Sequence, residues 1–405
     1  MAVARVSAPP ERATRPLLYW FSAGHFANDC GPAALWIVAP AMAASLQMAP
    51  SDVGLLIAIL QAGAGLAYLP AGILGDRASD NGRLLLLTFV WVSLGYAASS
   101  FAPGFWSIAL VLAVAGLGDA AWHPIATGIL VRLRPERRAE ALGIHAFGGT
   151  LAEVCSPLAV GFLIGAVGWR NSLLLAALPA ALMALAFVSI ARRVPRDEGR
   201  RISRADLLSL LARWRRPAGM RLVVTIASYN MALLAILAMM PLYLQLRHGF
   251  APAATGVAFS AMIFLGALVQ PGIGRLSDRL GRKPVVLVGN ALAAAAAFSA
   301  GFSGGDVHIA LASLAIAITA LTAVRSALLA AAVDYSGQRE STTLGLAFSL
   351  LFGVGALGAW LGGLAANVDL EAAFLLAGGF SVIAGALCLA TDFRQPAPTT
   401  AFDSN

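Results

Sequence analysis

The chain is dominated by long apolar runs that are separated by short stretches rich in Pro, Gly and charged residues. Each run is close to or above the roughly 20 residues that an α-helix needs to cross the hydrocarbon core of a bilayer. The pattern therefore predicts an all-α membrane protein with twelve transmembrane helices in two six-helix halves. The first set of runs covers residues 17–46, 53–75, 84–101, 105–131, 139–167 and 170–191, and the second covers 221–246, 254–276, 285–302, 307–333, 342–366 and 371–391.

The segment between the two sets is polar: residues 192–220 contain nine Arg, three acidic residues and two Pro. Such a composition stays in water, because charged side chains are costly in hydrocarbon. We expect this segment to link the two halves and to contain a surface helix over 203–214. The predicted organisation is a tail (1–16), an N-terminal half (17–191), a basic linker (192–220), a C-terminal half (221–391) and a second tail (392–405).

Composition agrees with a chain that lives mainly in lipid. Of the 405 residues, 59% are hydrophobic and 12% are charged, against about 25% charged in a typical soluble domain. A water-soluble fold is thereby excluded. Twelve spans of about 20 residues leave only enough chain for turns, tails and the linker.

The formal net charge of +8 is distributed unevenly along the predicted topology. All but three of the 28 Lys and Arg lie in tails and loops that the twelve-span layout places on one side of the membrane; the three are Arg170, Arg247 and Arg325. Basic loops face the cytoplasm in membrane proteins. We therefore expect both termini in the cytoplasm and no nucleic-acid partner.

The two halves also repeat one another. A shift of 202 positions lays Gly72-Ile-Leu-Gly-Asp-Arg77 on Gly274-Arg-Leu-Ser-Asp-Arg279, Leu142-Gly143 on Leu344-Gly345, Gly161 on Gly363, Asn28 on Asn230 and His123 on Arg325. Parallel repeats with a binding site between them near mid-membrane are typical of secondary transporters.

At this point the whole chain resembles the major facilitator superfamily. The resemblance rests on the twelve-span layout, the basic central linker and the motif Gly-x-Leu-x-Asp-Arg after spans two and eight. The resemblance implies a latch on the cytoplasmic side, formed by Gly72, Asp76, Arg77, Gly274, Asp278, Arg279 and Arg282. The first copy departs from the pattern, because Ala78-Ser-Asp-Asn81 delays the next Gly-Arg pair to Gly82-Arg83.

Within the superfamily, the chain is most similar to the fosmidomycin resistance protein group of drug exporters. The residues that carry this likeness are His25-x-x-Asn28-Asp29, Gly116-x-Gly118-x-Ala-x-x-His123-Pro124, and Gly148-Gly149 followed by Pro157 and Gly161. The resemblance implies proton-coupled export across a bacterial inner membrane.

Few ionisable residues lie inside the predicted spans. Helical rise places Asp29, Asp119, Glu153 and Arg325 about 20 Å from the nearest cytoplasmic charge, and His25 and His123 about 15 Å from it. His25 and Asp29 are four residues apart, as are Asp119 and His123, so each pair shares a helix face. Imidazole and buried carboxyl groups exchange protons near neutral pH.

We therefore predict that His25, Asp29, Asp119, His123 and Glu153 couple transport to protons. Structural readings stay open for each of them: His25 and Asn28 as a hydrogen bond across a helix contact, Asp29 and Asp119 as structural pairs, His123-Pro124 as a helix kink, and Glu153 as a packing anchor. His145 lies closer to the cytoplasmic end and is expected at the membrane interface.

Arg325 is a permanent cation inside a span and needs an anion. It either pairs with Asp29, Asp119 or Glu153, or receives an anionic group of the substrate such as a phosphonate or carboxylate. We favour the substrate role. The predicted substrate-binding set is Asn28, Tyr229, Asn230, Arg325 and Ser326.

The function predicted from these features is a monomeric antiporter in the bacterial inner membrane that exports a small, anionic drug or metabolite in exchange for protons. Uptake of an organic anion by the same fold is the alternative. A membrane enzyme or receptor is remote, because the His and acid pairs that could serve a catalytic site lie deep in the predicted spans, and neither a nucleotide motif nor Cys spacing for a metal is present. We expect neither cofactor nor metal.

Overall fold

The computed structural model describes residues 11–134, 137–196, 204–336 and 340–391. Within these ranges every regular element is helical. The elements are α1 (Glu11–Leu46), α2 (Pro50–Arg77), α3 (Asn81–Phe101), α4 (Phe105–Leu133), α5 (Arg138–Ala176), α6 (Leu178–Ile190), a short 3₁₀ turn (Ala191–Arg193), α7 (Arg204–Trp214), α8 (Pro217–His248), α9 (Pro252–Leu280), α10 (Arg282–Gly301), α11 (Val307–Ser336), α12 (Glu340–Ser349), a π-helical turn (Leu350–Val354), α13 (Leu357–Ala366) and α14 (Ala372–Leu389).

Eleven helical segments in the described ranges are long and apolar enough to cross a membrane. One of them, Glu140–Arg193, has 54 residues, about twice what one crossing needs. The chain changes direction inside it at Gly168, whose φ of 75° favours glycine. This segment therefore holds two crossings, and the twelve-span fold predicted from the apolar runs is confirmed.

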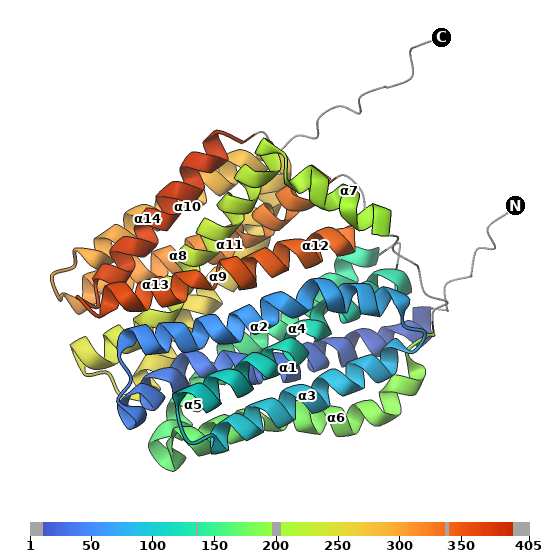
Figure 1. Ribbon diagram of the computed structural model, residues 1–405, viewed down its shortest axis with the longest axis horizontal. Helices are drawn as coiled ribbons and strands as arrows, with labels where there is room; N and C mark the ends of the chain where they lie inside the picture. The colour runs from blue at the N-terminus through green and yellow to red at the C-terminus, as the bar shows by residue number, and fades with distance from the viewer. Residues whose placement is uncertain (1–10, 135–136, 197–203, 337–339, 392–405) are drawn as a thin grey trace, which may run out of the picture.

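The helices form two bundles that lie side by side with their axes along the long dimension of the molecule (Figure 1). Helices α1–α6 make one bundle and α8–α14 the other, and α2 and α5 of the first contact α12, α13 and α9 of the second. We call the end where α1 begins and α14 ends the linker end, and the opposite end the loop end.

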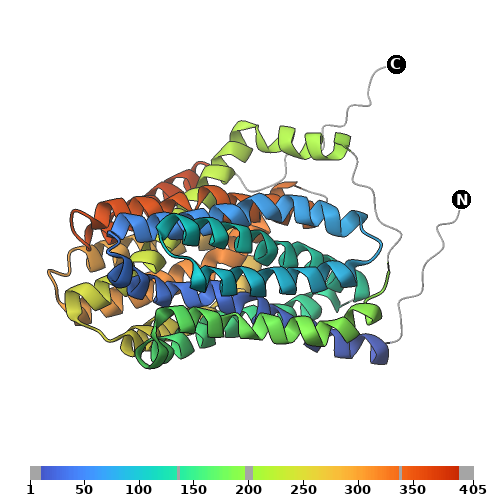
Figure 2. The same cartoon turned by 60° about the horizontal axis from the view of Figure 1, so that its bottom comes forward.

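The linker helix α7 begins at Arg204 and lies outside both bundles (Figure 2). It ends at Trp214, as predicted, whereas the predicted first residue, Ser203, lies outside the described residues. The ring of Trp214 packs edge-on against Tyr335 of α11, and the Tyr335 hydroxyl donates to the carbonyl of Arg213 (3.1 Å). The linker is thus fixed to the end of α11.

Short loops and side-chain caps turn the chain at the loop end. Arg170 donates to the carbonyls of Ser100 and Ala102, both at 2.8 Å, and so holds the end of α3. Asp306 accepts from the backbone N–H groups of Ile309 and His308 at the start of α11. These hydrogen bonds hold the pKa of the Asp306 carboxyl below its usual range.

At the loop end the two halves meet through backbone contacts. Gly54 of α2 lies so close to α13 that a Cβ atom would stand 2.2 Å from the carbonyl oxygen of Ala359. A Cβ on Gly363 of α13 would stand 2.5 Å from the carbonyl oxygen of Pro50. Ser51 and Asn367 add two hydrogen bonds across this contact, at 3.0 and 2.9 Å.

A second contact of the same kind joins α5 to α9. A Cβ on Gly256 would stand 2.7 Å from the carbonyl oxygen of Pro157, and one on Gly161 would stand 2.8 Å from that of Pro252. The 202-residue shift places Gly54 on Gly256 and Pro50 on Pro252, and it places Ala359 on Pro157 and Gly363 on Gly161. We call the two contacts the glycine seams; they are one structure made twice by the repeat.

The first copy of the predicted latch motif makes contacts within the N-terminal half. Asp76 at the end of α2 pairs with Arg132 of α4 at 3.3 Å. A Cβ on Gly72 would lie 3.6 Å from the Pro124 side chain of α4, whereas Arg77 is exposed. The motif therefore ties α2 to α4.

The second copy lies within the C-terminal half. Arg282 at the start of α10 pairs with Asp278 of α9 and with Asp334 of α11 (3.2 Å). A Cβ on Gly274 would lie 3.5 Å from the Ser326 hydroxyl of α11, and Arg279 is exposed. Both copies therefore connect helices of one half, and their function as a latch stays a prediction.

We expect Gly54→Ala to open the loop end. The added methyl would overlap the Ala359 carbonyl, and overpacking of this kind costs about 1–3 kcal/mol, which corresponds to a population shift of roughly 5- to 150-fold. Spin labels are attached to Pro103→Cys and Val368→Cys in a background without the three native cysteines. The distance between the two labels, measured by electron paramagnetic resonance, should lengthen.

Gly104→Ala is the matched control, because it lies at the same end with nothing within 4 Å of its Cβ position. Equal distance distributions in the Gly54→Ala and Gly104→Ala proteins would contradict the role given to the seams.

Candidate functional site

A cavity of about 330 Å³ lies between the two halves. The N-terminal half lines it with His25, Asp29, Asp119, His123 and Glu153, which are the five residues predicted to couple transport to protons. The C-terminal half contributes Arg325 and Asn230 together with several apolar side chains. The structure thus brings the predicted acids and imidazoles to one wall and the buried cation to the other.

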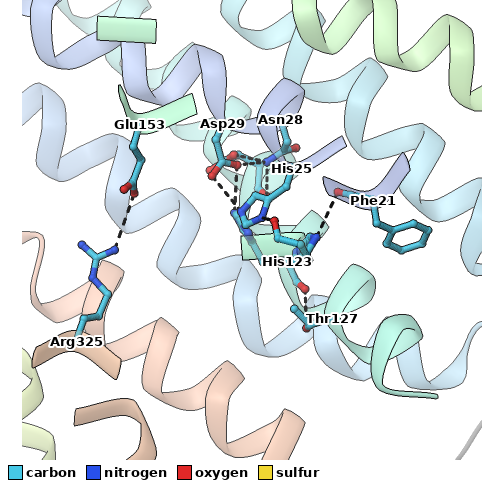
Figure 3. Close-up of polar contacts among 10 residues, drawn as sticks. Phe21, His25, Asn28, Asp29, His123, Thr127, Glu153 and Arg325 are labelled. Atoms are coloured by element: carbon cyan, nitrogen blue, oxygen red, sulfur yellow. Dashed lines mark hydrogen bonds and ion pairs between the residues drawn. The ribbon is translucent and has the colours of Figure 1, made fainter. Parts of the chain in front are cut away.

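Asp29 is the centre of the polar wall (Figure 3). Its carboxylate lies 3.2 Å from His25 Nε2, one helical turn earlier on α1, and 3.8 Å from His123 Nε2 on α4. The His25 and His123 rings stand edge to face with centroids 5.0 Å apart. The two imidazoles therefore converge on the same carboxylate from two helices.

The other ring nitrogen of His25 fixes where protons can lie. His25 Nδ1 is 2.9 Å from the backbone carbonyl oxygen of His145. A carbonyl oxygen only accepts, so Nδ1 carries a hydrogen and donates it. The contact between Nε2 and the Asp29 carboxylate is then a hydrogen bond only when a second proton sits on the imidazole or on the carboxyl. The geometry of the His25–Asp29 pair therefore accommodates one additional proton.

Asp119 belongs to the same cluster through an amide. Asn28, fully buried on α1, donates from Nδ2 to Asp119 Oδ1 (2.6 Å) and to Asp29 Oδ1 (3.1 Å). The sequence spacing pairs Asp119 with His123 on α4, but the structure directs His123 toward Asp29 and gives Asp119 to Asn28. A single amide thereby bridges the two aspartates.

His145 lies deeper in the structure than its sequence position indicates. Its ring is stacked on that of His25 with centroids 4.2 Å apart, and its Nδ1 donates to the carbonyl of Phe21 at 3.3 Å. It is buried between helices, which its sequence position did not indicate; its place relative to the membrane interface stays a prediction. The physical reason is that Gly148 and Gly149 bring α5 against α1 at Ser22 and His25, which encloses the preceding turn.

Glu153 and Arg325 face each other across the cavity (Figure 3). Glu153 Oε1 on α5 is 3.9 Å from an Arg325 guanidinium nitrogen on α11. This distance is at the outer limit of an ion pair, and both side chains line the cavity. The pair joins the two halves, and an anion in the cavity would compete with Glu153 for the same guanidinium.

The remaining predicted substrate residues are placed differently. Tyr229 is fully buried and donates to the carbonyl of Leu321 (2.6 Å), and the Ser326 hydroxyl faces Gly274 of α9. Neither is among the residues that line the cavity. Asn230 lines it but donates to the carbonyl of Leu351 at 2.5 Å. Substrate contacts by Asn28, Tyr229, Asn230 and Ser326 stay predictions.

His25, Asp29 and His123 also form the one group in the described residues with donor atoms placed close enough to hold a metal ion, all within 4.8 Å of one another. The His25–Asp29 separation of 3.2 Å is, however, that of a direct hydrogen bond. We therefore interpret the cluster as a proton site.

Comparison with known proteins agrees with this arrangement of helices and cavity. The profile of the Major Facilitator Superfamily matches residues 21–356 and 248–404. The chain belongs to the major facilitator superfamily. A solved structure of a bacterial homologue of the human lysosomal transporter Spinster, inward-facing and occupied, superimposes with a TM-score of 0.79 at 17% identity, over 94% of this chain and 97% of that one. At this identity the likeness concerns the fold alone.

Two relatives in sequence are transporters by name. A probable sugar efflux transporter of Mannheimia succiniciproducens is 30% identical over 38% of this chain and 39% of its own length. A probable 4-methylmuconolactone transporter of Cupriavidus pinatubonensis is 26% identical over 62% of this chain and 59% of its own. The chain thus covers less than two thirds of the length of each of these two curated relatives.

We expect Asn28→Leu to destabilise the protein by about 1–3 kcal/mol, because it leaves the buried Asp119 carboxyl without the amide donor. Tryptophan fluorescence during thermal unfolding in detergent would report the change as a lower midpoint.

Asn290→Leu in the other half is the matched control, because buried Asn290 bonds only to Val286 of its own helix. If the two variants lose the same stability, Asn28 has no special role in holding the aspartates together.

Proposed function

We propose that this protein is a proton-coupled antiporter that exports a small organic anion by alternating access between its two halves. The observation that carries the proposal is the His25–Asp29 contact. With His25 Nδ1 committed to the His145 carbonyl, the contact at 3.2 Å requires an added proton. A proton site that faces a central cavity is what proton coupling needs.

The proposed roles follow from the two walls of the cavity. His25 and Asp29 hold the coupling proton, His123 exchanges it with them, and Asp119 is linked to the pair through Asn28. Arg325 receives the anionic group of the substrate, assisted by Asn230. Glu153 is displaced from Arg325 by that anion and takes up a proton when it loses its cation.

This competition links the two ligands. An anion on Arg325 favours a protonated Glu153, and release of the anion favours the ionised Glu153 paired with Arg325. This linkage by itself carries proton and anion together, as in the uptake alternative; the antiport proposal assigns the exchanged proton to the His25–Asp29 pair. Proton and substrate then alter the same contact between the halves. Because rocking of the halves changes which side the cavity faces, movement of one ligand is tied to movement of the other.

The finer assignments are also proposals. The residues shared with the fosmidomycin resistance group support export of a phosphonate or similar anion, and the sugar efflux relative supports outward transport of small solutes. The basic linker and loops favour cytoplasmic termini in a bacterial inner membrane. We propose that the monomer is the transporting unit, since the cavity is lined by one chain.

Uptake is the second candidate. The same acids would admit protons together with an organic anion. One relative is named a probable 4-methylmuconolactone transporter, and that name gives no direction of transport. Direction is decided by gradients and by the order of binding, so the measurement below records the sign of proton movement.

The first test uses proteoliposomes of known orientation that contain a pH-sensitive dye. Fosmidomycin should drive protons in the direction opposite to its own movement, and a neutral drug should not. Arg325→Ala should reduce the fosmidomycin response at least tenfold, because it removes the anion's partner. Arg247→Ala, which lies outside the cavity lining, is the matched control.

Proton movement in the same direction as the drug would replace export by uptake. No proton response to any organic anion in the wild-type protein would overturn proton coupling itself.

A second test separates the proton site from the fold. In His25→Asn the amide can still donate to the His145 carbonyl, but Nε2 is gone; Asp29→Asn and Asp119→Asn remove the carboxylates. We expect proton-driven transport to fall at least tenfold in His25→Asn and to be abolished in both aspartate variants. Fosmidomycin binding, followed by tryptophan fluorescence, should be retained.

Asp306→Asn, at the loop end, controls for loss of a carboxylate as such. Fully coupled transport in both Asp29→Asn and Asp119→Asn would refute the proposed relay.

A further inference from the structure

A cluster of four aromatic rings connects the proposed proton site of the N-terminal half to the C-terminal half. The ring of Tyr68 on α2 stacks on that of His123 with centroids 5.8 Å apart. Tyr68 also stacks on Phe348 of α12 (5.3 Å) and on Phe352 of the π-helical turn (5.2 Å). We call His123, Tyr68, Phe348 and Phe352 the aromatic bridge. Tyr68 is its central member and is 4% exposed.

The backbone holds this bridge tightly. Gly65, one turn before Tyr68, approaches the C-terminal half so closely that a Cβ atom would stand 2.5 Å from the backbone nitrogen of Gly353. No side chain larger than hydrogen fits there. The Tyr68 ring is thereby pressed against the π-helical turn, and a displacement of one must displace the other.

The C-terminal end of the bridge has an unusual backbone. The N–H of Gly355 bonds to the carbonyl of Leu350, five residues earlier, and Asn230 of α8 donates to the carbonyl of Leu351. A π-helical turn is rare and is frequent at functional sites. Its return to α-helix would rotate α12 by about one residue, or roughly 100°, relative to α13. Such a return would give the element a second discrete arrangement.

The N-terminal end of the bridge is surrounded by titratable groups. Those near His123 are His25 and Asp29 of α1, Asp119 of its own helix, and His145 and Glu153 of α5. A neutral imidazole stacks on Tyr68 by dispersion, whereas an imidazolium is attracted to the electron-rich ring face as well as to Asp29. Proton occupancy therefore alters the force on the Tyr68 ring.

We infer that Tyr68 is a positioning residue that transmits the occupancy of the proton site to the π-helical turn, so that α12 moves with proton binding. This inference rests on the proposed proton coupling. Tyr68 lines the cavity beside the proton-binding pair and Arg325, and its ring contacts both His123 and the π-helical turn.

The test compares two rates in proteoliposomes. Uphill transport of fosmidomycin driven by a proton gradient needs coupling, whereas exchange of labelled for unlabelled fosmidomycin at equal pH does not. We expect Tyr68→Leu to lower uphill transport at least tenfold and exchange by less than threefold. Tyr68→Phe keeps the ring and should retain both rates.

Phe259→Leu is the matched control. Phe259 of α9 stacks on Trp36 of α1 across the same two halves, with centroids 6.2 Å apart, but has no contact with His123 among the ring pairs of the described residues. A merely structural loss, as expected for this variant, lowers both rates by the same factor. Parallel losses in Tyr68→Leu would overturn the inference.

A second measurement does not depend on transport. Hydrogen–deuterium exchange of residues 345–356, corrected for the chemical rate, should differ between pH 6 and pH 8 in the wild-type protein and in Tyr68→Phe. The difference should vanish in Tyr68→Leu and, if that variant is unstable, in Phe352→Leu. Equal exchange at the two pH values in the wild type would overturn the inference.

The two proposals fail in different ways. Loss of proton coupling in the wild-type protein removes the proposed function and the inference together. Coupled transport in the wild type and in Tyr68→Leu removes only the inference.

Discussion

The polar interior of this protein depends on how the Asp29 carboxylate is surrounded. An ionised carboxylate inside a membrane span costs several kcal/mol unless charges and hydrogen-bond donors enclose it. The chain meets this requirement with two imidazoles and one amide, His25, His123 and Asn28, drawn from two helices. Because the same amide bonds to Asp119, a second acid is placed in the cluster. The acids and imidazoles at the cavity thus lie in the N-terminal half, and Arg325 of the C-terminal half lines the cavity opposite them.

The contacts between the halves explain why events in the cavity have consequences for the whole molecule. At the loop end the glycine seams bring backbone onto backbone. Nearer the cavity the halves are joined by the long Glu153–Arg325 pair and by the aromatic bridge. The first type of contact contains no ionisable side chain, whereas in the proposed mechanism the second changes with each bound proton or anion. A ligand can shift a conformational equilibrium only through contacts that differ between states, and the second type supplies them.

The apolar runs predicted all twelve spans because length and hydropathy alone decide whether a helix can cross a bilayer. The repeat indicated Gly161 and Gly363, which proved to lie in equivalent seams. The sequence also left open that Arg325 pairs with Glu153, as it does. It did not indicate that His123 turns to Asp29, that His145 is buried or that Tyr68 bridges the halves. In helices that are apolar on every face, no periodicity reveals which face meets the cavity, so contacts between helices are not encoded in spacing.

The glycine seams consist of carbonyl oxygens, Cα atoms and the neutral hydrogen bonds of Ser51 and Asn367. Closing them moves no ionisable group among these residues through the electric field of the membrane. A full charge moved across that field would be worth about 2.3 kcal/mol per 100 mV, but a neutral seam feels none of it. The seam atoms themselves therefore contribute no gating charge, and a membrane potential acts on this protein through ionisable groups elsewhere, among them Asp29, Glu153 and Arg325 at the cavity.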